Sequence, residues 1–145
     1  MTIIEDTAEK TPYCFDVPTE RRSLGRLPKE TGDYSVKGHE ALIRVERKGF
    51  DDLFGCLTSR LAVFKNQLKR LAKYKYHALL VDTSVEALML GSMHCKLPGG
   101  EALSRLMSLC VESGISPIFC GRHGSRVCQA WLAHAERKVH DARTS

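Results

Sequence analysis

The chain has 145 residues, of which 43% are hydrophobic and 27% charged, so it can fold around a core of its own and does not have the composition of a disordered segment. The longest apolar run near the middle, residues 78–81, is too short to span a bilayer, and the first ten residues lack the basic-then-apolar pattern of a signal peptide. These features argue against a membrane protein, a secreted precursor, a fibre and a multidomain enzyme.

The N-terminal part of the chain predicts a short strand, a loop and a hairpin, in that order. Residues 2–6 favour a strand that ends in acidic side chains. Residues 16–32 contain two prolines, two glycines and several charges, and therefore predict a loop. Residues 33–36 and 41–47 predict two strands of a hairpin, joined by a turn at residues 37–39.

Helices alternate with strands in the rest of the chain. Residues 60–74 predict an amphipathic helix, since four apolar side chains recur on one side at helical spacing and lysines recur on the other. We then expect a strand at 76–82, a short helix at 84–90, a helix at 98–111, a strand at 115–120 and a helix at 123–138. This order predicts one α/β domain over residues 1–145, with a central mixed β-sheet flanked by helices and a frayed tail at 139–145.

The six cysteines indicate reduced thiols rather than disulfides or zinc ligands. None forms a C-x-x-C pair, and several lie inside apolar runs. Cys120, His123 and Cys128 are spaced loosely like ligands, but no second half of a zinc site accompanies them. We therefore expect an intracellular protein, cytoplasmic in a prokaryotic host or nuclear in a eukaryotic one. We also expect no membrane contact and no organic cofactor.

Positive charge is concentrated in the middle of the chain. Residues 31–75 hold ten basic and five acidic side chains, so this third carries the whole net charge of +5. Residues 57–75 have no acidic side chain and include the basic residues Arg60, Lys65, Lys69, Arg70, Lys73 and Lys75. Such a surface would hold a polyanion through its phosphates, and the plainer alternative is a solvated helix face.

The hairpin predicts a candidate catalytic site. Side chains at i and i+2 of a strand point to the same face, so Glu46 and Lys48 share one face while Val45 and Arg47 share the other. The turn places Asp33 opposite residues 44–46, within reach of Glu46. Two carboxylates would share a hard divalent ion such as Mg²⁺, and the lysine would assist phosphodiester hydrolysis. On spacing alone, a partly exposed strand with ion pairs remains the alternative.

Residues 31–34 (TGDY) and 45–53 (VERKGFDDL) resemble the GD…ERKxxxD signature of XPF-type nucleases, structure-specific endonucleases of the PD-(D/E)xK superfamily. The resemblance spans most of residues 2–135, in a compact form similar to phage and prokaryotic members. It implies a restriction-endonuclease-like fold, Mg²⁺ or Mn²⁺ as cofactor, DNA as partner, and cleavage of branched or flapped DNA in repair or recombination. It also makes a homodimer an expected assembly.

Residue by residue, the resemblance makes Asp33 and Glu46 metal ligands and catalytic groups, and Lys48 the catalytic lysine. Arg47 and Asp52 match the signature as supporting residues. The opening strand matches a first acidic pair, in which Asp6 is a further metal ligand and Glu9 a supporting residue. Lys65, Lys69, Arg70 and Lys73 are the residues that we expect to contact DNA.

One position departs from the resemblance. Ala8 stands where the usual Asp-x-Arg-Glu pattern of the opening strand has arginine. An arginine there would pair with the carboxylates or touch phosphate, and alanine does neither. The alternative function is therefore a catalytically weakened or inactive relative that binds DNA or a partner protein. A third alternative is an interaction module that docks through the apolar stripes of residues 101–111 and 125–135.

Overall fold

A six-stranded mixed sheet forms the centre of the structure, a computed structural model that describes residues 1–145. The strands lie in the order β2-β1-β3-β4-β5-β6. Only β3 runs antiparallel to its neighbours, and the other three pairs are parallel. The mixed sheet predicted from the sequence is confirmed, with strands β1 (Ile3–Asp6), β2 (Thr19–Arg22), β3 (Tyr34–Val36), β4 (Ile43–Lys48), β5 (Tyr76–Val81) and β6 (Pro117–Phe119).

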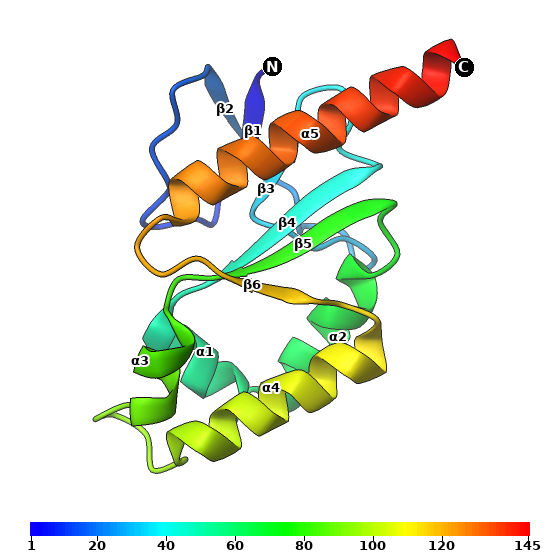
Figure 1. Cartoon of the computed structure of the whole chain (residues 1–145). Coiled ribbons are helices and arrows are strands. Elements are labelled where there is room, and N and C mark those ends of the chain that lie inside the picture. Colours follow the sequence, from blue (N-terminus) through cyan, green and yellow to red (C-terminus); the bar gives the residue numbers. More distant parts are fainter.

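Helices cover both faces of the sheet, as Figure 1 shows. One face carries the helices α1 (Phe50–Cys56), α2 (Leu61–Leu71), α3 (Val85–Leu90) and α4 (Gly99–Ser113). A single long helix, α5 (Gly124–Thr144), crosses the opposite face. Each face has its own apolar core, because the helices on it turn their buried side chains, repeating at three- and four-residue spacing, toward the sheet.

Strand β4 contributes to both cores by alternation. Ile43 and Val45 are fully buried on the α5 side, whereas Glu46 and Lys48 point to the side of α1 and α2. Burial of charged groups in a central strand is unfavourable unless they have partners. The strand therefore holds two charged side chains inside the protein at its C-terminal end, next to the first residues of α1.

The structure corrects three expectations about elements. Residues 19–22 form the edge strand β2 inside the segment expected to be a loop, and their mostly exposed, charged side chains carry no alternating pattern. Helix α1 was not predicted, because it has seven residues and no side-chain cap at its start. Helix α5 extends to Thr144, beyond the expected end at residue 138, since Val139 packs into the core on that face.

The cysteine expectation agrees with the structure. All six thiols are free, and four of them are buried: Cys56, Cys110, Cys120 and Cys128. No helix has the length and hydropathy needed to cross a bilayer. The apolar stripes of α4 and α5, which the sequence offered as docking surfaces, are largely buried: that of α4 in the core with α2 and α3, and that of α5 against the sheet.

Candidate active site

The hairpin of β3 and β4 brings Asp33, Glu46 and Lys48 together. Tyr34 pairs with Val45, and the backbone N–H of Asp33 donates to the Val45 carbonyl at 2.7 Å. Lys48 Nζ lies 3.5 Å from Glu46 Oε1, and both side chains are more than nine-tenths buried. The shared face of Glu46 and Lys48 and the position of Asp33 beside them agree with the strand spacing.

The carboxylates of Asp33 and Glu46 lie in a site that disfavours two negative charges. Burial raises the pKa of Asp33 well above its ordinary value, and the charge of Glu46 raises it further. Burial also raises the pKa of Glu46, against the opposing effects of Lys48 and of the Thr31 hydroxyl, which donates to Glu46 Oε2 at 3.2 Å. The pair therefore favours a positive partner, either a proton or a cation.

Lys48 remains charged despite its burial. Burial by itself lowers the pKa of its ammonium, but the neighbouring negative groups, Glu46 first, raise the pKa above its ordinary value. Its Nζ donates to Gln67 Oε1 at 3.2 Å, lies 3.7 Å from Asp52 Oδ2, and stands 5.4 Å from the centre of the Phe64 ring. Helices α1 and α2 thus fix the position of the ammonium group.

Gln67 is a site residue that the sequence analysis missed. It lies on α2 between the buried positions 64 and 68, and its side chain reaches Lys48 across a separation of 19 residues. No motif marks it. The one signal in the sequence was that a polar residue sits next to the apolar side of an amphipathic helix.

The structure gives Asp6 partners of its own. Asp6 Oδ1 accepts a hydrogen bond from the Leu24 N–H at 2.7 Å, and Oδ2 accepts one from the Ala8 N–H at 3.2 Å. The Asp6 N–H donates to the Asp33 carbonyl at 2.8 Å, but no hydrogen bond or ion pair joins the Asp6 carboxylate to the side chain of Asp33 or Glu46. Its carboxylate therefore ties two loops together, and its role as a third metal ligand stays a prediction.

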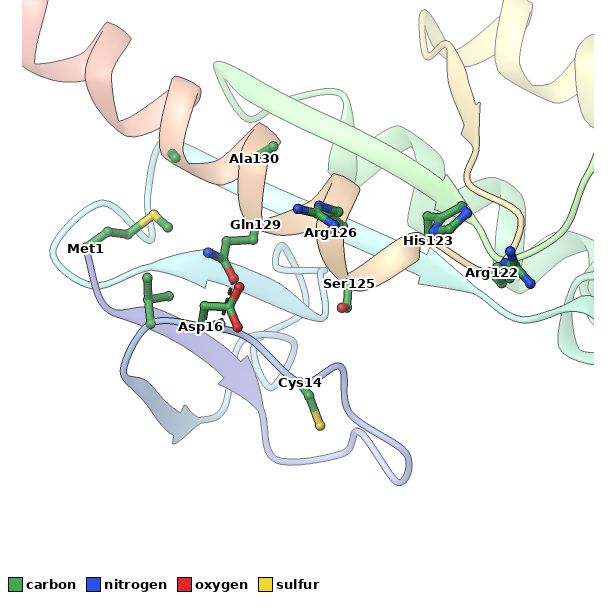
Figure 2. Close-up of a pocket in the computed structure, with 11 residues that line it drawn as sticks. Met1, Cys14, Asp16, Arg122, His123, Ser125, Arg126, Gln129 and Ala130 are labelled. Carbon is green, nitrogen blue, oxygen red and sulfur yellow. Dashed lines mark hydrogen bonds between the residues drawn. The ribbon is translucent and has the colours of Figure 1, made fainter.

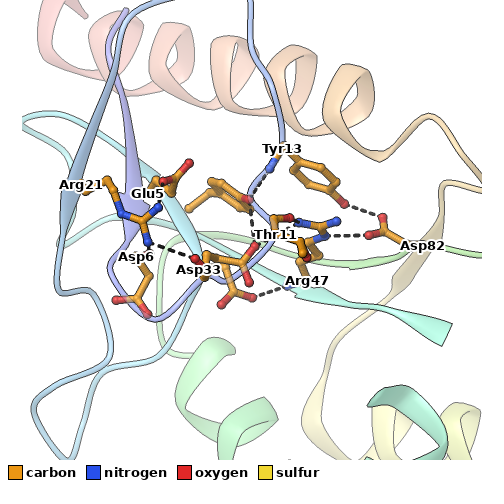
Figure 3. A network of polar contacts seen from close by, with 10 residues as sticks. Glu5, Asp6, Thr11, Tyr13, Arg21, Asp33, Arg47 and Asp82 are labelled. Atoms are coloured by element: carbon orange, nitrogen blue, oxygen red, sulfur yellow. Dashed lines mark hydrogen bonds and ion pairs between the residues drawn. The ribbon is translucent and has the colours of Figure 1, made fainter. Parts of the chain in front are cut away.

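Arg47 lies on the opposite face of β4, at the centre of a second polar network (Figure 3). Its guanidinium pairs with Asp82 at 2.6 Å and with Glu9 at 3.1 Å, and it donates to the Thr11 carbonyl at 2.6 Å. The same group lies 3.8 Å from the centre of the Tyr13 ring. Arg47 therefore fastens the chain after β1 to the ends of β4 and β5.

Two aromatic hydroxyls complete this network. Tyr13 donates to Asp82 Oδ1 at 2.5 Å, and Tyr34 donates to Glu9 Oε2 at 2.9 Å. Burial, and then the contact with Asp82, raises the pKa of Tyr13 far above its ordinary value, so the hydroxyl stays protonated. The sequence analysis missed Asp82 because its place beside Arg47 depends on the pairing of β4 with β5.

The basic residues expected on α2 divide into two groups. Lys65 forms an ion pair with Glu112 at 2.9 Å, and Arg70 donates to the Glu30 carbonyl at 3.2 Å. Lys69 and Lys73 are exposed and make no ion pair within the chain. These two side chains are free to bind a partner, whereas the first two already have contacts.

A cavity at the start of α5 lies away from this chemistry. It has a volume of about 700 Å³ and borders the start of α5, where Arg122, Ser125 and Arg126 face the N-terminal segment (Figure 2). Gln129 bridges it by accepting from the Asp16 N–H at 2.9 Å. None of Asp33, Glu46 and Lys48 lines this cavity, so its size does not locate the candidate active site.

Solved structures share this fold, although no protein-family model and no curated protein sequence match the chain. The XPF structure from Aeropyrum pernix has a TM-score of 0.69 and 21% sequence identity, over 99% of this chain and 69% of that one. XPF from the same organism in complex with DNA has a TM-score of 0.67 and 20% identity, over 94% and 66%. The chain thus spans about two thirds of their length and has the XPF fold that its signature predicts.

Proposed function

We propose that the protein is a divalent-metal-dependent DNA endonuclease of the XPF type, which hydrolyses phosphodiester bonds at branched or flapped DNA. The observation that carries the proposal is the grouping of Asp33, Glu46 and Lys48 at the end of β4. The XPF fold supports it, and so does the description of one structural neighbour as a complex with DNA.

The donor atoms of the site fit Mg²⁺ or Mn²⁺. Asp33 and Glu46 offer carboxylate oxygens, which these hard ions prefer. Burial, and then the negative charge of Glu46, raises the pKa of Asp33, which supports a site that gains by taking up a cation. Asp33 and Glu46 would hold the ion, which would polarise the scissile phosphate and supply an activated water.

In the proposed reaction, the residues of the protein position the reacting groups and supply positive charge. Asp33 is oriented by the Arg47 N–H, which donates to its Oδ2 at 2.8 Å. Lys48 carries a positive charge beside Glu46 and would neutralise the charge that develops on the phosphate in the transition state. Gln67 fixes the lysine from α2, so the ammonium needs little reorganisation when substrate arrives.

Cleavage of a panel of DNA substrates tests the proposal. Duplex, flap, fork and single-stranded DNA are incubated with Mg²⁺, with Mn²⁺ and with a chelator. We expect metal-dependent cleavage of flap or fork DNA, and a loss of about a hundredfold or more in Asp33→Asn, Glu46→Gln and Lys48→Met. Asp141→Asn, at the exposed end of α5, is the matched control and should cleave normally. Cleavage that survives in Asp33→Asn and Lys48→Met contradicts the assignment.

The exposed Ala8 favours one second candidate, a DNA-binding relative with weak or no cleavage. Its methyl group supplies no charge at the place where the resemblance expects a guanidinium. The variant Ala8→Arg separates the two functions. A large gain in cleavage indicates that the remaining chemistry is intact, whereas unchanged DNA binding without cleavage favours the binding-only function.

A further inference from the structure

A second group of metal-ligating side chains lies at the other end of the hairpin. His39, in the turn between β3 and β4, meets Glu136 and His140 from α5, and one ligand atom from each lies within 4.8 Å of the others. Glu136 and His140 are four residues apart and so project from the same side of the helix. The rings of His39 and His140 meet edge to face, with centres 5.4 Å apart.

His39 is buried without a complete set of partners. Only 8% of the residue is exposed, and its Nδ1 has no hydrogen-bond partner. Buried polar atoms almost always have a partner, because desolvation without one is unfavourable. An imidazole that is held inside the protein, unpartnered, and beside a second imidazole and a carboxylate has the surroundings of a metal ligand.

The backbone around these residues holds them in place. The His39 N–H donates to the Val36 carbonyl at 2.9 Å, and the His39 carbonyl accepts from the N–H groups of Leu42 and Ile43 at 2.9 and 3.0 Å. The helical segment that carries Glu136 and His140 is anchored by Val139, which packs in the core. The ligands therefore come from a closed turn and a packed helix, which limits the ordering needed on binding.

We propose that His39, Glu136 and His140 form a binding site for a borderline divalent transition metal such as Zn²⁺. Two imidazoles and one carboxylate suit Zn²⁺ better than Mg²⁺, which prefers oxygen ligands alone. Three protein ligands leave a position for water. The ion clamps the C-terminal half of α5 onto the hairpin and is separate from Asp33 and Glu46, which lie at the opposite end of β3 and β4.

Zinc titration of the full chain under reducing conditions tests this site by calorimetry and by thermal unfolding. We expect one Zn²⁺ to bind the unaltered protein and to raise its Tm by about 5–10 °C at saturation. His140→Ala and Glu136→Gln should weaken binding by about tenfold or more, because each removes one ligand. His140 is exposed, so its removal should leave the fold intact without metal.

Two controls separate this site from other zinc-binding groups. His134→Ala removes an exposed histidine of α5 outside the site and should bind Zn²⁺ normally. Asp33→Asn disables the proposed catalytic site and should also bind normally. Absence of zinc binding, or equal binding by the unaltered protein and His140→Ala, overturns the proposal. Loss of binding in Asp33→Asn with retention in His140→Ala also overturns it, and assigns the zinc to the catalytic carboxylates.

Discussion

Asp33 carries a negative charge that the folded protein does not favour in the absence of a cation. Its neighbour Glu46 already has Lys48 as a counter-ion at 3.5 Å, so the charge of Asp33 is in excess. A carboxyl whose pKa is higher in the folded than in the unfolded chain binds more protons when folded. The free energy of unfolding therefore falls as pH rises from about 4, the ordinary pKa of such a group, through the raised value in the folded state.

Asp33→Asn should accordingly stabilise the metal-free protein, although it weakens the proposed cleavage. Asparagine can still accept the hydrogen bond of the Arg47 N–H, but it removes the excess charge. We expect a Tm roughly 2–4 °C higher than that of the unaltered protein near pH 8, with little difference near pH 4. Thermal unfolding in a chelator across this pH range measures the effect. Equal pH dependence of the two proteins would contradict it.

Arg47 has a structural role in the second network, on the other side of the same strand. Arg47→Ala leaves the carboxylates of Asp82 and Glu9 without their cation in a half-buried place. We expect a loss of about 3 kcal/mol in the free energy of unfolding, measured by urea denaturation. Arg22→Ala, which removes an exposed pair with Glu20, is the control and should cost much less. Similar losses in the two variants would refute a special role for Arg47.

At the residue scale, local pattern predicted the groups that share a strand or a hairpin. Period two along β4 and the register of the turn placed Asp33, Glu46 and Lys48 correctly relative to one another. The contacts of Gln67 and Asp82 depend on helix packing and on a parallel pairing across 19 and 35 residues of sequence. Apart from the polar position of Gln67 beside the apolar side of its helix, packing and pairing leave no local signal, so spacing did not identify these residues.

The different sides of helix α2 have two different proposed roles. Gln67 faces the candidate site, whereas Lys69 and Lys73, near its C-terminal end, are exposed. Gln67→Ala should lower the rate constant of cleavage about threefold to tenfold and leave DNA affinity unchanged, because it removes only the hydrogen bond that positions Lys48.

The double variant Lys69→Ala/Lys73→Ala is the matched comparison on the same helix. It should weaken DNA binding and reduce the salt slope of log affinity by about one for each lysine–phosphate interaction removed, while the rate at saturating DNA stays unchanged. Fluorescence anisotropy against salt and single-turnover cleavage measure the two effects. If both variants change the same quantity, the proposed division of α2 is wrong.

Helices α3 and α4 meet at a glycine. A side-chain carbon at Gly99 would overlap the backbone carbonyls of Leu88 and Met89, whereas one at Gly100 would meet no atom within 4 Å. Gly99→Ala should therefore lower the free energy of unfolding by about 1–3 kcal/mol. Gly100→Ala should leave it unchanged or raise it by up to about 1 kcal/mol, since alanine favours the helix. Denaturant titration compares them, and equal stability of the two variants would contradict the close approach.

At the element scale, strong apolar periodicity predicted the longer elements correctly, whereas two short elements were not predicted. The hairpin, α2, β5, α4 and α5 follow apolar repeats that reflect burial against the sheet. Strand β2 is an exposed edge of four residues, and α1 is a short helix between two charged neighbourhoods. Their positions come from tertiary packing, which a local pattern does not report.

At the scale of the whole molecule, the proposed catalytic residues lie where the antiparallel and the parallel parts of the sheet meet. Strand β4 is antiparallel to β3 and parallel to β5, so its C-terminal end adjoins residues from the N-terminal hairpin and from the parallel half. Residues 33, 46–48 and 67 lie together at this end of β4. The alternation of strands and helices was sufficient to predict an α/β class, but the strand order required the structure.

The alternating faces of β4 also affect how the sequence of such a protein can evolve. The proposed catalytic groups at positions 46 and 48 lie on one side, while positions 45 and 47 place a core side chain and the ion-paired arginine on the other. Substitutions at one set leave the other set in place. A lineage can therefore lose the proposed cleavage activity through substitutions at two positions and still inherit a well-folded scaffold.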